Sequence, residues 1–153
     1  MESTWKLLHV GIPVKDLDKT IDDYKSLGVA SFKPEYLIDS RNFAEYLVNG
    51  KTPDSVIKTR AAKGEVGSLG IELLQPVQGK TVHKEFLESD DLGIGHIAYE
   101  VDDLETEIEK LVEKGFPVIL SFTSKGDTRR RGVYMDTRSH FSNLILELIQ
   151  AEQ

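Results

Sequence analysis

Four residues of this sequence have types and positions that suit metal chemistry: His9, Glu72, His96 and Glu147. Both glutamates stand in apolar, strand-like runs, residues 70–75 and 144–150. A carboxylate in such a run is costly to bury unless something compensates its charge. Two imidazoles and two carboxylates without sulfur suit a borderline or hard divalent ion, so Ni, Co, Mn, Fe and Zn all remain candidates. We therefore predict that the four residues hold one divalent metal ion of unknown identity.

The two histidines open a repeated stretch of sequence. Counting from His9 to His96 gives an offset of 96 − 9 = 87 positions, and the repeat runs without a gap as far as Gly28 and Gly115. The other matched positions are Val14 with Val101, Asp16 with Asp103, Leu17 with Leu104, and Ile21 with Ile108. Internal repeats indicate copies of one structural unit, so the four candidate ligands take equivalent places in two copies.

Local signals predict the same elements in each copy. Residues 9–14 alternate and are rich in branched side chains, which predicts a strand, and Asp16 is a candidate helix N-cap. Gly28 is a candidate helix end. Apolar residues recur at helical spacing in both copies: Leu17, Ile21 and Tyr24, then Leu104, Ile108 and Leu111. The second copy repeats the plan with a strand over 95–101, Asp103 as the cap and Gly115 as the end.

Strand-like stretches follow each predicted helix. They are expected at 30–38, 42–48, 55–62 and 69–75, with a longer hairpin or loop around 50–66, and then at 117–122, 131–136 and 143–150. One such module cannot cover the inner face of its own sheet. We therefore predict an α+β fold in which two βαβββ modules form a curved, partly open mixed β-barrel. The single domain spans 1–153, with module 1 at about 5–78, a linker helix at about 81–89 and module 2 at about 93–150.

Composition excludes several other classes of protein. The chain has 153 residues and no cysteine, which excludes disulfides, thiolate metal sites and thiol nucleophiles. Its net charge of −7 argues against nucleic-acid binding. No apolar run approaches the roughly 20 residues of a membrane span, and residues 1–6 lack the apolar core of a signal peptide. We expect a cytoplasmic protein without a membrane partner.

A single basic cluster stands out against the acidic background. It consists of Arg129, Arg130 and Arg131, followed by Arg138. It is either a solvated loop or a patch that meets an anionic group of a substrate. The two remaining histidines, His83 and His140, have no counterparts in the repeat and are expected to be structural or surface residues.

The stretches 8–18, 71–76, 84–88 and 93–103 resemble the vicinal oxygen chelate superfamily, which includes glyoxalase I, methylmalonyl-CoA epimerase, extradiol dioxygenases and bleomycin-resistance proteins. The resemblance covers essentially the whole chain and is closest to epimerase-like and glyoxalase I-like members. It implies paired βαβββ modules with metal ligands on their first and last strands, which matches His9, Glu72, His96 and Glu147 one by one. It also implies a homodimer and a small-molecule substrate, either an acyl-CoA or a thiol adduct.

The resemblance implies a metal-dependent isomerase or lyase. The favoured reaction is epimerase-like abstraction of a proton beside a thioester carbonyl through a metal-stabilised enolate, with Glu147 as the base and Glu45 as a candidate second base. A glyoxalase I-like lactoylglutathione lyase acting on a thiol hemithioacetal is one alternative. The other is a non-catalytic small-molecule binding or resistance protein, although such proteins often lack the metal ligands.

Overall fold

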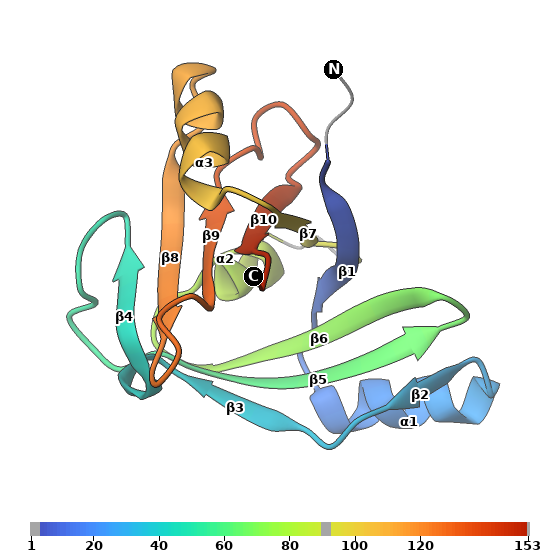
Figure 1. Ribbon diagram of the computed structural model, residues 1–153. Helices are drawn as coiled ribbons and strands as arrows, with labels where there is room; N and C mark the ends of the chain where they lie inside the picture. Colours follow the sequence, from blue (N-terminus) through green and yellow to red (C-terminus); the bar gives the residue numbers. More distant parts are fainter. Residues whose placement is uncertain (1–3, 90–92, 153) are drawn as a thin grey trace. The chain divides into compact units, whose positions relative to one another are not determined.

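The computed structural model describes residues 4–89 and 93–152 of the chain (Figure 1). The two ends of the predicted domain, and the first half of the segment 1–6, lie outside these residues. Helices and strands mix along the described chain, which confirms the α+β class. In chain order the elements are β1 (Lys6–Pro13), α1 (Leu17–Leu27), β2 (Ala30–Phe32), β3 (Tyr36–Asp39), a 3-10 turn (Ser40–Asn42), β4 (Phe43–Val48), β5 (Lys58–Val66), β6 (Leu69–Gln78), α2 (Val82–Glu88), β7 (His96–Val101), α3 (Leu104–Glu113), β8 (Val118–Ser124), β9 (Arg131–Met135) and β10 (Ile145–Gln150).

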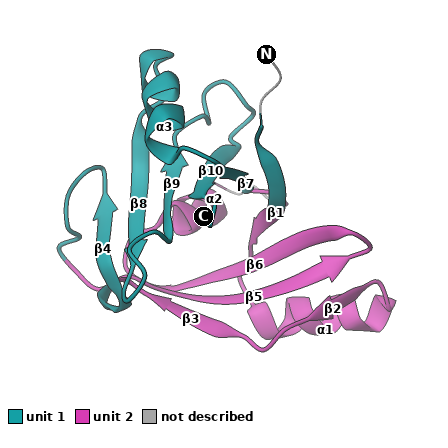
Figure 2. Ribbon diagram, viewed as in Figure 1, with its two compact units in different colours: residues 1–8, 41–54, 96–153 teal, residues 9–40, 55–95 magenta. Residues whose placement is uncertain are grey.

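The chain divides into two compact units, shown in magenta and teal in Figure 2. We call residues 9–40 and 55–95 the His9 unit, and residues 1–8, 41–54 and 96–153 the His96 unit. Each unit contains one of the two histidines that open the repeat.

In the His9 unit the strands follow the order β2-β5-β6-β1, and β3 also pairs with β5. The pair β1–β6 is parallel and the other pairs are antiparallel. Helix α1 covers one face of this sheet, because its apolar stripe packs on Ala62 of β5 and Leu73 of β6. The buried core there consists of Val14, Leu17, Ala62 and Leu73, with Ile21 and Tyr24 packed against it.

In the His96 unit the order is β7-β10-β9-β8-β4, with β7–β10 parallel and the rest antiparallel. Helix α3 covers one face, over a core of Val101, Leu104, Leu111, Val133, Met135 and Leu148. The two units therefore have the same strand pairing and direction. The strand β7 corresponds to β1, β10 to β6, β9 to β5, and β8 to the pair β2/β3. This equivalence confirms the two predicted βαβββ modules.

Strand β4 is the exception to the order of the sequence. The segment 42–48 was expected among the strands of the first half, but β4 pairs with β8 and extends the sheet of the His96 unit. Strand propensity identifies a strand but does not select its partner, since the partner depends on distant residues.

The predicted helix ends are confirmed in detail. Asp16 caps α1 by accepting the Lys19 N–H at 2.9 Å, and Asp103 caps α3 by accepting the Thr106 N–H at 3.1 Å. Gly28 ends α1 in the left-handed region with φ 66°. In the linker helix α2, Phe86 and His83 are buried, whereas Val82 and Leu87 are half-buried.

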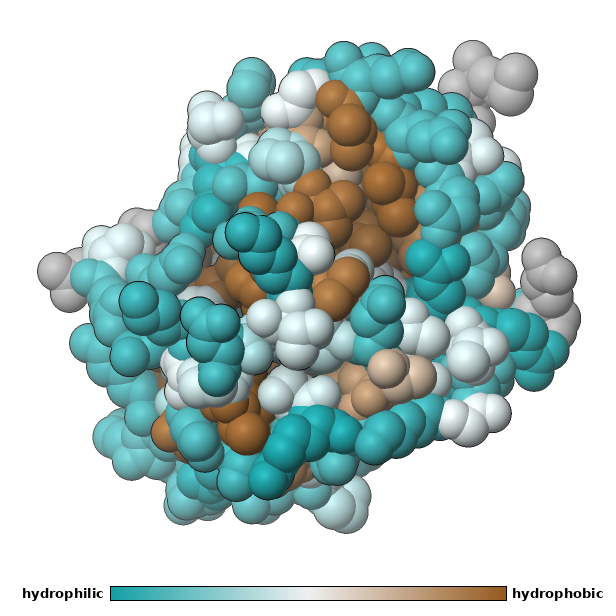
Figure 3. Space-filling view, turned by 90° about the vertical axis from the view of Figure 1, so that its left-hand side faces the viewer, coloured by the Kyte–Doolittle hydropathy of each residue, from teal (hydrophilic) through white to brown (hydrophobic). Residues whose placement is uncertain are grey.

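The surface seen from the side on which β4, β8 and α3 lie is mainly hydrophilic, with a band of hydrophobic residues (Figure 3). Val112 at the end of α3 is 50% exposed and Phe141 is 48% exposed. Exposed apolar residues of this kind are normal in folded proteins, so they do not by themselves define a binding surface.

Candidate metal centre

The first buried His–Glu pair lies in the His9 unit. Parallel pairing of β1 with β6 sets Glu72 opposite Gly11, so His9 and Glu72 emerge from neighbouring strands on the face away from α1. His9 Nε2 lies 3.7 Å from Glu72 Oε1. Both residues are buried, at 9% and 6% exposure.

The second pair lies at the equivalent place in the His96 unit. In the parallel pair β7–β10, His96 stands opposite Ile145 and Glu147 opposite Ala98. Leu148 points into the core under α3, and the alternation of the strand sends Glu147 to the other face. His96 Nε2 lies 3.1 Å from Glu147 Oε2, and the two residues are 1% and 5% exposed.

The spacing in the His96–Glu147 pair fits adjacent ligands of one metal ion, and the spacing in the His9–Glu72 pair is slightly longer. Donors that lie 2.0–2.2 Å from a metal, at angles between octahedral and tetrahedral, are separated from each other by about 2.8–3.6 Å. The observed 3.1 Å falls inside that range, and 3.7 Å lies just outside it. A separation of 3.7 Å is too long for a hydrogen bond. All four side chains are of types that could hold a metal ion.

Two residues that the sequence did not single out surround Glu72. Tyr36 on β3 donates its hydroxyl hydrogen bond to Glu72 Oε2 at 2.6 Å. Lys63 on β5 stands directly opposite Glu72 in the register, and its Nζ lies 5.9 Å from the centre of the Tyr36 ring. No spacing rule connects residues 36, 63 and 72, because sheet pairing alone brings them together.

Aromatic residues line the same face of the sheet in the His96 unit. Tyr134 stands opposite Glu147, and its ring centre lies 5.1 Å from that of His96. Further along the face, the ring centre of Phe122 lies 5.8 Å from that of Phe43. Tyr46 pairs with Phe122, and burial raises the pKa of its phenol to about 12. Of these aromatic residues, Tyr134 is the one that packs directly against the His96–Glu147 pair.

Glu45, the predicted second base, lies on β4 and is exposed. The register sets it opposite Thr123, whereas the neighbouring Tyr46 stands opposite Phe122 on the face that carries Glu147. Alternation therefore directs Glu45 to the other face of this sheet. Its role in the chemistry stays a prediction.

The arginine cluster is engaged with acidic groups of the chain. Arg129 pairs with Asp127 at 3.0 Å, Arg130 with Glu152 at 3.6 Å, Arg131 with Glu105 of α3, and Arg138 with Asp136 at 2.9 Å. These pairs correspond to the expectation of a solvated loop. His140 is exposed, as expected, with its ring 5.0 Å from that of Phe116.

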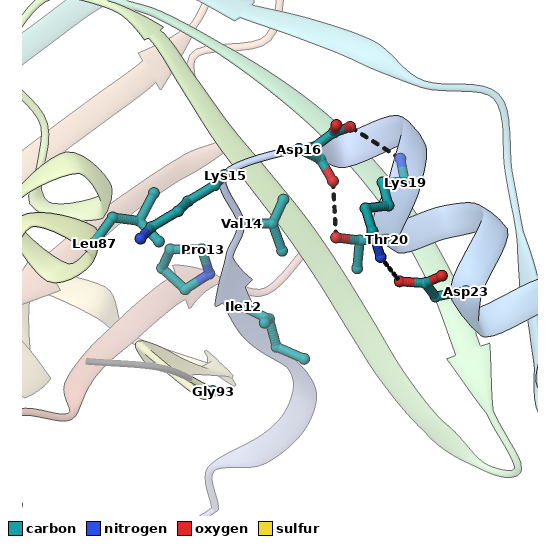
Figure 4. A pocket seen from close by; sticks show the side chains of 10 residues that line it. All are labelled: Ile12, Pro13, Val14, Lys15, Asp16, Lys19, Thr20, Asp23, Leu87 and Gly93. Atoms are coloured by element: carbon teal, nitrogen blue, oxygen red, sulfur yellow. Dashed lines mark hydrogen bonds and ion pairs between the residues drawn. The ribbon is translucent and has the colours of Figure 1, made fainter. Parts of the chain in front are cut away.

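A groove of about 350 Å³ lies in the His9 unit where β1 runs into α1 (Figure 4). Its apolar wall includes Ile12, Pro13 and Leu87. Among its charged residues, Asp16 caps the helix and Lys19 pairs with Asp23 at 2.6 Å. Among the residues that the structure describes, no histidine or glutamate lines the groove, so it is separate from the His9–Glu72 pair.

Comparison with known proteins agrees with this fold. Residues 8–134 match the family model described as Glyoxalase/Bleomycin resistance protein/Dioxygenase superfamily. The chain therefore belongs to this superfamily, as the resemblance in the sequence predicted. No curated protein matches the chain.

Solved structures with the same fold include two kinds of protein. A hypothetical protein from Bacillus halodurans C-125 is 20% identical, with 99% of this chain and 97% of that chain covered and a TM-score of 0.71. Methylmalonyl-CoA epimerase from Mycobacterium tuberculosis is 22% identical, with 100% and 94% covered and a TM-score of 0.69. A variant of the Streptomyces coelicolor methylmalonyl-CoA epimerase, in complex with 2-nitronate-propionyl-CoA, is 17% identical, with 97% and 98% covered and a TM-score of 0.65. Among the described residues, no helix is long and apolar enough to cross a membrane.

Proposed function

We propose that this chain is a metal-dependent isomerase of the methylmalonyl-CoA epimerase type, in which His9, Glu72, His96 and Glu147 hold one divalent cation. The observation that carries the proposal is the pair of buried His–Glu couples at equivalent places in the two units. Membership of the glyoxalase superfamily and the fold shared with epimerases support it.

One shared ion accounts for the ligands better than two separate ions. A single couple offers only one imidazole and one carboxylate, whereas protein metal sites of this donor type use three or four protein ligands. Two couples related by the repeat supply four. They also supply two negative charges, which balance a divalent cation in a buried place.

In the proposed reaction a bound divalent cation supplies Lewis acidity that lowers the energy of the enolate formed beside the thioester carbonyl. The carboxylate of Glu147 takes the proton from the carbon next to that carbonyl, so a C–H bond breaks and an O–H bond forms. Tyr134, which stands opposite Glu147 and is itself buried, shields the base from water on that side. Return of a proton to the opposite face of the same carbon gives the epimer. Glu45 was predicted for that second transfer, but the register directs it away from the face that carries Glu147, so Glu45 could act only if strand β4 changed its position.

Metal binding is the first test. Chelator-stripped protein is titrated with Ni²⁺ and with Co²⁺ by calorimetry, beside His96→Ala and the exposed-histidine control His140→Ala. We expect about one ion per chain for the wild type and the control, and none for His96→Ala. A folded wild-type protein that binds neither ion would overturn the proposal.

Proton exchange is the second test. Methylmalonyl-CoA is incubated in D₂O with the metal-loaded protein, and deuterium at the carbon beside the thioester carbonyl is followed by NMR. We expect Glu147→Gln to lower the exchange rate by at least about 100-fold, as loss of a general base does, while the variant keeps its fold. Because Glu147 is also a proposed metal ligand, the rate is measured on variant protein shown by calorimetry to hold the ion. Exchange at the wild-type rate in Glu147→Gln would remove this residue as the base, and Glu45→Gln tests the second transfer in the same assay.

A glyoxalase I-like lyase is the second candidate, because the sequence also resembles glyoxalase I-like members of the superfamily and the proposed ligands fit either reaction. The same protein is assayed with the hemithioacetal of glutathione and methylglyoxal. Turnover of this substrate without exchange in methylmalonyl-CoA would replace the epimerase assignment. Metal binding without activity on either substrate favours a non-catalytic binding protein. A homodimer and a cytoplasmic location stay predictions.

A further inference from the structure

The two carboxylate oxygens of Glu72 have different neighbours. Oε1 lies 3.7 Å from His9 Nε2, whereas Oε2 accepts the hydrogen bond from the Tyr36 hydroxyl at 2.6 Å. All three residues belong to the His9 unit. A hydroxyl that donates to an ionised carboxylate makes one of the stronger hydrogen bonds in proteins, and its length here is typical of that class.

Sheet geometry explains why a tyrosine makes this contact. Tyr36 on β3 stands opposite Ala61 of β5, and Lys63 of β5 stands opposite Glu72 of β6. Tyr36 and Glu72 therefore lie on the same face, two strands apart, or about 9–10 Å along the sheet. Ala61 leaves room for the ring to lie across β5, and the Lys63 ammonium 5.9 Å from its centre adds an attraction to the ring face.

In the His96 unit, the position equivalent to Tyr36 has a different residue. There Tyr134 corresponds to Lys63, because each stands opposite the glutamate of the last strand. Phe122 then corresponds to Tyr36, because it stands opposite the residue two positions earlier, Gly132. Phenylalanine has no hydroxyl group, so the repeat is asymmetric at the position that donates to Glu72.

We propose that Tyr36 is a positioning residue that holds Glu72 as a fixed, one-oxygen metal ligand. By engaging Oε2, the hydroxyl prevents the carboxylate from rotating and leaves Oε1, the oxygen next to His9, for the ion. Hydrogen-bond partners of metal ligands commonly have this role. The inference rests on the proposed metal site. It gives the two carboxylates different roles, because Glu72 is held in place as a ligand and Glu147 acts as the base.

The test compares Tyr36→Phe with Tyr24→Phe. Tyr24 is a control in the same unit, with its ring packed 5.8 Å from that of Phe32 on the face covered by α1. Ni²⁺ affinity is measured by competition with a chelator, and the visible spectrum of the Co²⁺ form is recorded. We expect Tyr36→Phe to weaken Ni²⁺ binding by about 10- to 100-fold. We also expect its Co²⁺ bands to weaken, because a carboxylate free to bind through both oxygens raises the coordination number. Tyr24→Phe should change neither.

Tyr36 is 37% exposed, so loss of its hydroxyl should leave the fold intact. A double variant, Tyr36→Phe with Glu72→Gln, covers the case in which the single variant does not fold, since it also removes the charged group that the hydroxyl serves. We expect the double variant to bind Ni²⁺ as Glu72→Gln alone does.

Two results would overturn the inference while leaving the metal site in place. One is Tyr36→Phe with the wild-type Ni²⁺ affinity and Co²⁺ spectrum. The other is a double variant that binds Ni²⁺ much more weakly than Glu72→Gln. If the wild-type protein binds no metal, it is instead the proposed function that fails.

Discussion

Glu72 and Glu147 occupy the same place in the two repeats, but their neighbours give them different environments. Glu72 accepts a hydrogen bond from a tyrosine hydroxyl, whereas Glu147 lies on a face lined by Tyr134, Phe122 and Tyr46. The sequence identified both carboxylates because each interrupts an apolar strand. It did not identify Tyr36, because its hydrogen bond with Glu72 joins residues that are 36 positions apart in the chain and depends on how the strands pair.

Burial of Tyr46 leads to a testable pH dependence. Burial raises the pKa of its phenol from 10.0 to about 12, so the folded state keeps this proton in a range where the unfolded state has lost it. The stabilisation is complete below pH 10 and is lost as the pH rises through 12. Urea unfolding at pH 9 and at pH 11.5 should show a loss on the order of 2 kcal/mol that Tyr46→Phe reduces. An absorbance titration in which Tyr46 ionises near pH 10 would contradict this expectation.

At the scale of the elements, the last strand of each module, β6 or β10, makes the same hydrogen bond to the start of that module's helix, α1 or α3. Each carries a glutamine three residues after its glutamate. Gln75 accepts the Leu17 N–H at 2.9 Å, and Gln150 accepts the Leu104 N–H at 3.0 Å. Three positions along a strand reverse the face, so the glutamate points to the candidate site and the glutamine to the helix. One short stretch thereby places the ligand and fixes the start of the helix.

Removal of this contact should destabilise the fold without removing a metal ligand. Gln75→Leu leaves the Leu17 N–H without its acceptor, and we expect a loss of about 1–2 kcal/mol in the free energy of unfolding. The exposed Gln78→Leu on the same strand is the matched control. Urea unfolding of the metal-free proteins measures the difference. Equal midpoints for the two variants would show that the glutamine contact contributes nothing to stability.

The elements also show where prediction from the sequence stopped. Both long helices, their caps and the order of strands in each module followed from local patterns such as Asp16 and Gly28. The pairing of β4 with β8 did not, because an isolated strand pattern is compatible with several edges.

At the scale of the whole molecule, charge bears on the choice of substrate. The chain carries a net charge of −7, and each arginine of the cluster 129–131 has an acidic partner within the His96 unit. A coenzyme A phosphate would have to displace Asp127, Glu152 or Glu105 to bind there. Exposed ion pairs of this kind are weak, so the exchange is feasible but has little net gain. The cluster therefore gives no preference for a CoA thioester over a glutathione adduct.

The division of the ligands between two units gives the last prediction. An ion that binds only the folded chain stabilises it by about 2.7 kcal/mol at a concentration of 100 times its Kd. His9 lies in one unit and His96 in the other. If all four ligands share one ion, His9→Ala and His96→Ala should each abolish the rise in Tm that excess Ni²⁺ produces, whereas His140→Ala should keep it. If each couple instead bound its own ion, each variant would retain part of the rise, and calorimetry would give two ions per chain. Thermal unfolding of the three variants, with and without Ni²⁺, therefore decides whether the metal links the two halves of the repeat.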